Sequence, residues 1–131
     1  YELTAGNTTV LATPLCTMQG VLVMCSALYS GGHVVIPPGG DFDPILFWDM
    51  VADDSVSWIS GTPESIMDLY EKTLPNPPSS SALSFVRSCA GFGGSACIPA
   101  DMLARVEDTL KAPILESYGP PEAAGLATAN R

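Results

Sequence analysis

The segment Tyr118-Gly119-Pro120-Pro121-Glu122 holds the side chains with the clearest chemical potential. A tyrosine can stack on a flat ring, a glycine lets the backbone turn tightly, and a carboxylate can hold a divalent cation. The same residues could equally form a proline-rich turn with an exposed carboxylate. The spacing alone therefore leaves two interpretations open, a ligand site and a surface turn.

A second candidate is the glycine-rich stretch from Gly91 to Ala96, which matches the pattern G-x-G-x-x-A. It follows a predicted strand and precedes a predicted helix, and Glu116 closes the next predicted strand, as in a dinucleotide-binding unit. The spacing argues against that function, because the fingerprint needs the helix to begin within the glycines. Pro99 delays the helix by about a turn. A flexible loop is the alternative, and a dinucleotide-binding αβ domain stays a further hypothesis.

Two common catalytic chemistries have weak support in the sequence. The four cysteines form no Cys-x-x-Cys pair and His33 is the single histidine, so no zinc site is expected. The scattered cysteines favour a reducing compartment over a disulfide framework. Gly94-Ser95-Ala96 lacks the full nucleophile elbow, and no geometric case pairs His33 with Ser95, so a Ser-His hydrolase is not expected.

Composition and charge limit the class of protein. The chain has 131 residues, 47% hydrophobic and 15% charged, which suits one folded core and argues against disorder. Fourteen acidic against five basic side chains give a net charge of −9, which argues against nucleic acid and anionic membrane surfaces as partners. No apolar stretch reaches the ~20 residues that span a bilayer. We expect a piece of a longer intracellular protein, cytoplasmic or peroxisomal.

The elements that must position these residues alternate between strands and helices. The predicted strands are 9–12, 33–36, 56–60, 84–88 and 113–117, and the predicted helices are 18–30, 43–52, 62–72 and 99–110. The helix 18–30 is apolar nearly all round and is interpreted as buried, and 74–81 as an exposed Pro/Ser loop. The alternation predicts an α/β fold with a mostly parallel sheet and flanking helices. Ligands lie beyond the carboxyl ends of such strands, which would bring 118–122 near 91–95.

The residues from Ile114 to Ala124 resemble the tyrosine-glycine-x-threonine-glutamate motif of the adenylate-forming (AMP-binding) superfamily. This superfamily includes acyl-CoA synthetases, nonribosomal adenylation domains and luciferases. Further stretches resemble its segments in the same order along nearly the whole chain, which argues against coincidence. They are Thr13-Pro14-Leu15 with Gly20, Gly31 to Val35, Phe42 to Trp48, Val56-Ser57-Trp58, Thr62-Pro63, Phe85 to Ser88 and Gly94 to Pro99.

The resemblance implies the central part of the large N-terminal domain of an acyl-CoA synthetase-like enzyme, in a setting such as fatty acid metabolism. In this superfamily a carboxylate attacks the α-phosphate of ATP, which yields an acyl-adenylate and pyrophosphate. A thiol, commonly coenzyme A, then takes the acyl group. The implied partners are a small-molecule carboxylic acid, ATP, Mg²⁺ and coenzyme A.

The resemblance also implies a role for each matching residue. Tyr118, with Gly119 beside it, would stack on adenine. Glu122 would bind Mg²⁺ and serve as the catalytic carboxylate, and Glu116 and Ser117 would border the adenine through their backbone. The residues that would line the adenine and acyl pocket are Gly93, Gly94, Ser95 and Ala96.

Several departures from the superfamily pattern open an alternative. Its phosphate loop would lie before Tyr1, and its ribose-binding aspartate and C-terminal lid with a lysine would follow Arg131. Thr17 stands where many members have histidine, and Pro121 replaces the motif threonine, whose hydroxyl meets the phosphates. We therefore expect the isolated chain to be inactive and Pro121 to weaken catalysis. A non-catalytic remnant or interaction module remains an alternative function.

Overall fold

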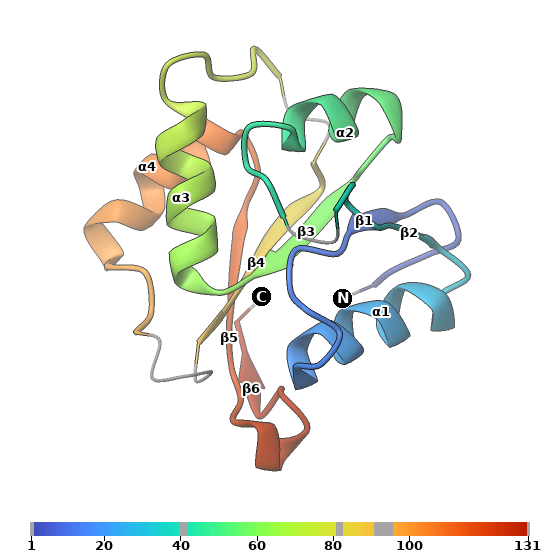
Figure 1. The fold of residues 1–131 in the computed structure, drawn as a ribbon. Coiled ribbons are helices and arrows are strands. Elements are labelled where there is room, and N and C mark those ends of the chain that lie inside the picture. The colour runs from blue at the N-terminus through green and yellow to red at the C-terminus, as the bar shows by residue number, and fades with distance from the viewer. Residues whose placement is uncertain (1, 40–41, 81–82, 91–95, 131) are drawn as a thin grey trace.

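The computed structural model describes residues 2–39, 42–80, 83–90 and 96–130, which build a six-stranded sheet in the order β2-β1-β3-β4-β5-β6 (Figure 1). Neighbouring strands are parallel except for β5 and β6, which are antiparallel. This confirms the predicted α/β fold with a mostly parallel sheet. The strands are β1 (Thr8–Val10), β2 (His33–Val35), β3 (Trp58–Gly61), β4 (Phe85–Ala90), β5 (Ile114–Tyr118) and β6 (Thr128–Ala129).

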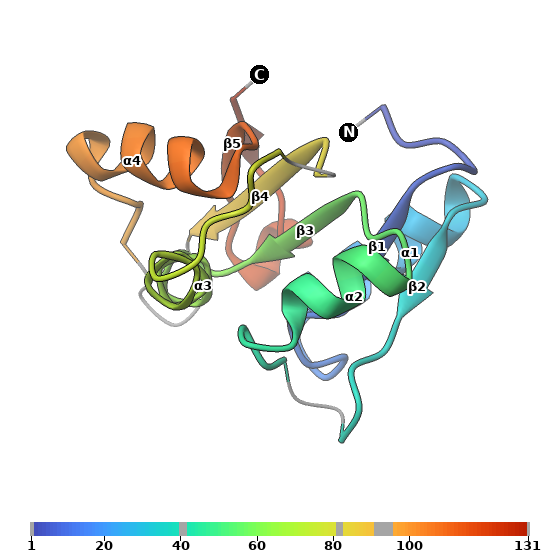
Figure 2. The same ribbon diagram turned by 90° about the horizontal axis from the view of Figure 1, so that it is seen from above.

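Helices lie on both faces of the sheet, α1 on one and α2, α3 and α4 on the other (Figure 2). The chain moves from β1 outward to β2, returns past β1 to β3, and then continues in the same direction to β4 and β5. Because crossovers between parallel strands are right-handed, this reversal of direction places α1 opposite the other three helices. The helices are α1 (Met18–Tyr29), α2 (Phe47–Asp53), α3 (Pro63–Thr73), α4 (Ala100–Leu110) and the short 3-10 helix η1 (Pro121–Ala123).

Each face of the sheet has its own apolar cluster. The larger cluster joins strand residues such as Ile59 and Val86 to Leu69 of α3 and Leu110 of α4, all of them fully buried. On the other face, Trp58 and Phe85 stack with ring centroids 5.5 Å apart beneath α1. The sheet is therefore buried on both sides, as parallel sheets usually are.

Local signals explain where two of the helices begin. The Thr62 hydroxyl accepts from the backbone N–H of Ser65 at 3.3 Å, and Pro63 occupies the first position of α3, as the cap-plus-proline pattern predicts. The same pattern at Asp43 predicts the start of α2 too early. The Asp43 carboxylate does accept from the N–H of Ile45 at 2.8 Å, but it stabilises only a turn, and the helix begins at Phe47.

The helix predicted over 18–30 is buried on one side only. One side of α1, with Val23 and Ala27, packs on the sheet. On the other side Val21 is 41%, Leu28 57% and Tyr29 96% exposed. Among the described residues no layer covers this outer side of α1, so its apolar side chains meet solvent.

Other differences from the predicted elements are small. Strand and helix ends shift by one or two residues, and β6 and η1 have no counterpart in the prediction. Residues 74–80 form the expected loop and are exposed apart from Pro78, while Ser81 lies outside the described residues. All four cysteine thiols are free, and Cys89 is the buried one. No described helix combines the length and the apolar character that crossing a bilayer requires.

Candidate functional site

The two segments singled out in the sequence follow neighbouring strands, β4 and β5. Ala90 and Tyr118 are register partners at the ends of these strands, and the Gly119 N–H donates to the Ala90 carbonyl at 3.3 Å. The proximity of 118–122 to 91–95 stays a prediction, because 91–95 lie outside the described residues. Gly93, Gly94 and Ser95 themselves lie outside the described residues. Ala96 is exposed and lines a shallow groove against α3, with Pro63 and Met67.

Glu116 and Tyr118 project from the same face of β5, because side chains two residues apart in a strand share a face. Tyr118 is 50% exposed, so part of its ring is free for contact with a ligand. One carboxylate oxygen of Glu116, Oε1, is buried and has no hydrogen-bond partner among the described residues. The end of β5 thus carries an accessible aromatic ring beside an unpaired acceptor.

The backbone around these side chains is already paired. The Glu116 carbonyl accepts from the Asn130 N–H at 3.0 Å, and the Tyr118 carbonyl accepts from the Ala127 N–H at 2.9 Å. On its other edge β5 pairs with β4. A ligand at this edge would therefore find the side chains of Glu116 and Tyr118 more available than their backbone groups.

Gly119 lets the chain fold back tightly after β5. A Cβ at this position would lie 2.4 Å from the backbone nitrogen of Leu126, closer than real Cβ atoms come. The reversal between them uses positive φ angles at Ala124 (56°) and Gly125 (79°). This tight loop carries η1 and holds it against the end of β5.

Glu122 is exposed in the first turn of η1, so its carboxylate faces solvent near the end of β5. Pro121 opens this short helix, where a missing N–H costs no hydrogen bond, and its carbonyl still accepts from Ala124 at 3.0 Å. Pro120 has φ −69° and ψ 160°, the extended conformation expected before a proline. The two prolines are accommodated in the loop without backbone strain.

The described residues contain no group of three or more His, Cys, Asp or Glu side chains that could hold a metal ion by themselves. A single carboxylate is nevertheless enough for one kind of site. Mg²⁺ keeps several waters and is commonly bound by one or two carboxylates together with substrate phosphates. The exposed Glu122 carboxylate fits that role and does not fit a site made of protein ligands alone.

A buried row of polar side chains lies behind the site, on the face of the sheet that α1 covers. Gln19 Nε2 donates to Ser60 Oγ at 3.5 Å, Ser60 Oγ contacts Cys89 Sγ at 3.6 Å, and Cys89 Sγ lies 2.9 Å from Ser117 Oγ. The row joins α1, β3, β4 and β5. It places Ser117 in a supporting role, with its side chain directed away from Glu116 and Tyr118. Gln19 was not predicted from the sequence, although a lone amide inside an apolar helix indicates a buried polar contact.

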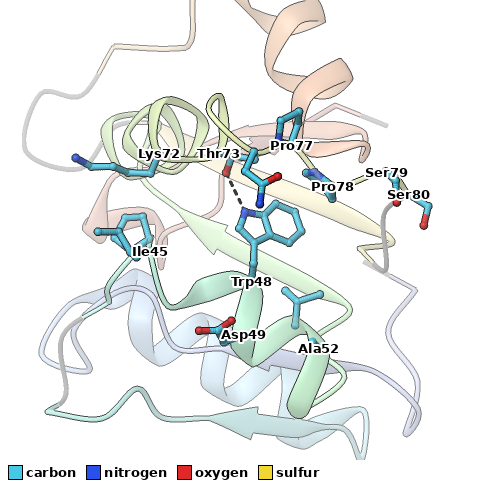
Figure 3. A pocket seen from close by; sticks show the side chains of 13 residues that line it. Ile45, Trp48, Asp49, Ala52, Lys72, Thr73, Pro77, Pro78, Ser79 and Ser80 are labelled. Carbon is cyan, nitrogen blue, oxygen red and sulfur yellow. Dashed lines mark hydrogen bonds between the residues drawn. The ribbon is translucent and has the colours of Figure 1, made fainter.

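A cavity of about 810 Å³ lies elsewhere (Figure 3). It runs between α2 and the loop after α3, beside the C-terminal end of α3 and thus toward the amino ends of the strands. The Trp48 indole N–H donates to Thr73 Oγ1 at 2.9 Å, and this hydrogen bond holds the indole ring in the wall of the cavity. None of the side chains predicted from the sequence as functional lines this cavity, so its size does not identify it as the site.

Comparison with known proteins assigns the chain to a family. The family model described as "AMP-binding enzyme" matches residues 1–131. The chain is 32% identical to the probable CoA ligase CCL9 of Humulus lupulus, over 99% of this chain and 24% of that protein. It is 34% identical to the oxalate–CoA ligase of Saccharomyces cerevisiae, over 99% of this chain and 22% of that protein. It therefore spans about a quarter of the length of these curated relatives.

A solved structure gives the same answer for the fold. The O-succinylbenzoate coenzyme A synthetase of Bacillus subtilis, in complex with ATP and magnesium ion, superposes with a TM-score of 0.80 at 19% identity. The superposition covers 98% of this chain and 25% of that one.

Proposed function

Because the chain belongs to the AMP-binding enzyme family, we propose that it supplies the adenine-binding edge of an ATP-dependent ligase that joins a carboxylic acid to coenzyme A. In the first step a carboxylate oxygen of the acid bonds to the α-phosphorus of ATP, and the bond from that phosphorus to pyrophosphate breaks. In the second step the thiol sulfur bonds to the acyl carbon and AMP leaves. Such reactions depend mainly on positioning and on charge stabilisation around the phosphates.

The observation that carries the proposal is the pair of side chains on one face of β5, the half-exposed Tyr118 ring and the unpaired Glu116 Oε1. Adenine presents a flat ring and an exocyclic amine, which is a hydrogen-bond donor. The ring would stack on Tyr118, and the amine would donate to the Glu116 carboxylate. A buried acceptor without a partner is unfavourable, so a donor at this position would be bound selectively.

Glu122 is the residue proposed to hold Mg²⁺ together with the phosphates of ATP. When bound, the ion supplies positive charge to the phosphate oxygens. Within this chain, of net charge −9, few basic side chains are present to meet a polyanion, so the ion's charge would offset part of the repulsion. Glu122 lies four residues after Tyr118, so base and phosphates would be held by the two ends of one short segment.

We propose a short polar acid as the substrate. Two of the curated relatives, at 30% and 34% identity, are oxalate–CoA ligases. This relationship supports a short polar acid over a long apolar one, so fatty acid metabolism is the less supported setting.

The non-catalytic alternative has one structural observation in its favour. Thr17 stands where many superfamily members have histidine, and its hydroxyl is engaged in the N-terminal cap of α1, accepting from Gly20 at 3.1 Å and donating to the Pro14 carbonyl at 2.7 Å. Thr17 therefore caps the N-terminus of α1. The dinucleotide-binding alternative loses support because α4 begins at Ala100, well after the glycines.

Nucleobase selectivity tests the proposal. Guanine carries an oxygen where adenine carries its amine, so it would set an acceptor against the Glu116 carboxylate. We expect the protein to bind ATP more tightly than GTP by calorimetric titration, and Glu116→Gln to reduce that preference at least tenfold, because the amide can also donate. Glu71→Gln, an exposed change on α3, is the matched control and should leave the preference unchanged. Equal affinities for ATP and GTP in the unmodified protein would refute the proposed role of Glu116.

The acid is tested separately by acid-dependent exchange of labelled pyrophosphate into ATP. This assay uses the longer protein to which the chain is expected to belong, because the isolated chain is expected to be inactive. Oxalate should support faster exchange than decanoate. Exchange with neither acid, in a protein that binds ATP with the expected selectivity, would favour the non-catalytic alternative.

A further inference from the structure

A cavity of about 240 Å³ lies where the direction of the sheet connections reverses. The chain leaves β1 toward β2 on one face of the sheet and leaves β3 toward β4 on the other, although β1 and β3 are neighbours (Figure 2). In open α/β sheets, such a reversal leaves a crevice beyond the carboxyl ends of the two strands, and ligands bind in it. The cavity occupies this position, away from β5 and its Tyr118.

Three connections meet around this cavity. Its walls include Leu11, Ala12 and Thr13 after β1, Phe42 before α2, and Ser65 and Asp68 in the first two turns of α3. The wall combines apolar and polar groups. The polar groups are the hydroxyls of Thr13 and Ser65 and the exposed carboxylate of Asp68.

Thr13 is the residue in this wall that points to a ligand. It is only 8% exposed, and its hydroxyl oxygen is buried without a hydrogen-bond partner in the described part of the chain. Other threonine hydroxyls of the protein are paired, with Thr17 bonded to Pro14 and Thr73 to Leu69. Buried hydroxyls are nearly always paired, so a ligand that completes the hydrogen bonding of Thr13 would be bound favourably.

The charges around the cavity select the class of ligand. The Asp68 carboxylate, in a chain of net charge −9, opposes an anion. An ammonium ion would be attracted by the Asp68 carboxylate, but water screens that exposed charge, and the ion would lose hydration against the apolar part of the wall. We propose that this cavity binds a short, uncharged hydrogen-bonding group, an amide or an alcohol, whose polar atom meets Thr13 Oγ1.

This site is separate from the proposed adenine edge, and its test needs neither ATP nor turnover. Three probes of nearly equal size distinguish the ligand classes: propionamide is neutral, propionate is an anion and propylammonium is a cation. Each is titrated into the protein while backbone amide signals are followed by NMR. We expect propionamide to shift the signals of Leu11, Thr13 and Ser65 at the lowest concentration, and propionate to need at least tenfold more.

The variant Thr13→Val keeps the shape of the side chain and removes its hydroxyl. We expect it to weaken propionamide binding about three- to tenfold, the effect of one lost hydrogen bond. Thr128→Val, an exposed change in β6, is the control and should leave the affinity unchanged. Unaltered propionamide affinity in Thr13→Val overturns the role of the hydroxyl. Propionate or propylammonium binding as tightly as propionamide overturns the ligand class, and so does the absence of shifts with all three probes in the unmodified protein.

Discussion

Ala90 and Tyr118 are neighbours across the last rung of the β4–β5 ladder, although 27 residues separate them in the chain. The bond from the Gly119 N–H to the Ala90 carbonyl, at 3.3 Å, extends that pairing by one step. The pairing places the end of β4 beside the segment that carries Tyr118 and Glu122. The proposed adenine-binding edge depends on this relationship.

The ring of Tyr118 is predicted to contribute directly to ATP affinity. Tyr118→Ala should weaken ATP binding by about 5- to 150-fold, since stacking of a base on an aromatic ring contributes about 1–3 kcal/mol. Tyr118→Phe keeps the ring and should stay within about twofold of the unmodified protein. Calorimetric titration with ATP checks both variants. If Tyr118→Phe were as weak as Tyr118→Ala, the hydroxyl and not ring stacking would be responsible.

Gly119 is predicted to be irreplaceable on steric grounds. An added Cβ would lie 2.4 Å from the backbone nitrogen of Leu126, so the loop that carries η1 must shift. Gly119→Ala should lower the free energy of unfolding by about 1–3 kcal/mol, measured by urea denaturation. Gly6→Ala is the control, because its Cβ would meet nothing closer than Thr4 Oγ1 at 3.8 Å. Equal stability of the two variants would show that the loop yields freely.

Pro121 is predicted to limit adenylation. The superfamily motif has a threonine at this position, and Pro121 offers no side-chain polar atom to the phosphates. Pro121→Thr should raise the pyrophosphate exchange rate of an active protein, by up to about 10²–10³-fold if the hydroxyl acts like a donor aimed at developing charge. Because Pro121 makes no hydrogen bond through its nitrogen, the change should leave the melting temperature nearly unaltered. An exchange rate within threefold of the original would mean that the proline is harmless.

The outer side of α1 is predicted to drive self-association of the isolated chain. Leu28 is 57% and Tyr29 96% exposed, and the α1 sequence contains no charged residue. Leu28→Lys should reduce both the binding of an apolar-surface dye and the apparent mass by light scattering, because exposed apolar patches promote association. Ala104→Lys adds the same charge to an exposed position of α4 and should change neither. Monomeric behaviour of the unmodified chain without dye binding would contradict this prediction.

Features that depend on a few neighbouring residues could be predicted from the sequence alone. Thr62-Pro63 marks the start of α3, Pro99 precedes α4, and the alternation of elements identifies a mostly parallel sheet. The motif around Tyr118 was found for the same reason, since its residues adjoin in the chain. At Asp43 the capping pattern precedes a turn that is not part of the helix, so the prediction placed the start of α2 too early.

Relationships between distant residues were decided by the tertiary structure. Sequence alone did not show that one Glu116 carboxylate oxygen has no hydrogen-bond partner among the described residues, while the neighbouring Ser117 is hydrogen-bonded to Cys89. Both depend on which face of β5 each side chain occupies and on what packs there. The sequence also did not predict β6, because its two residues form a strand only through their pairing with β5. The one-sided burial of α1 and the cavity at Thr13 arise from the reversal between β1 and β3. Local propensity acts through neighbours in the chain, whereas burial and pairing depend on which segments the fold brings together.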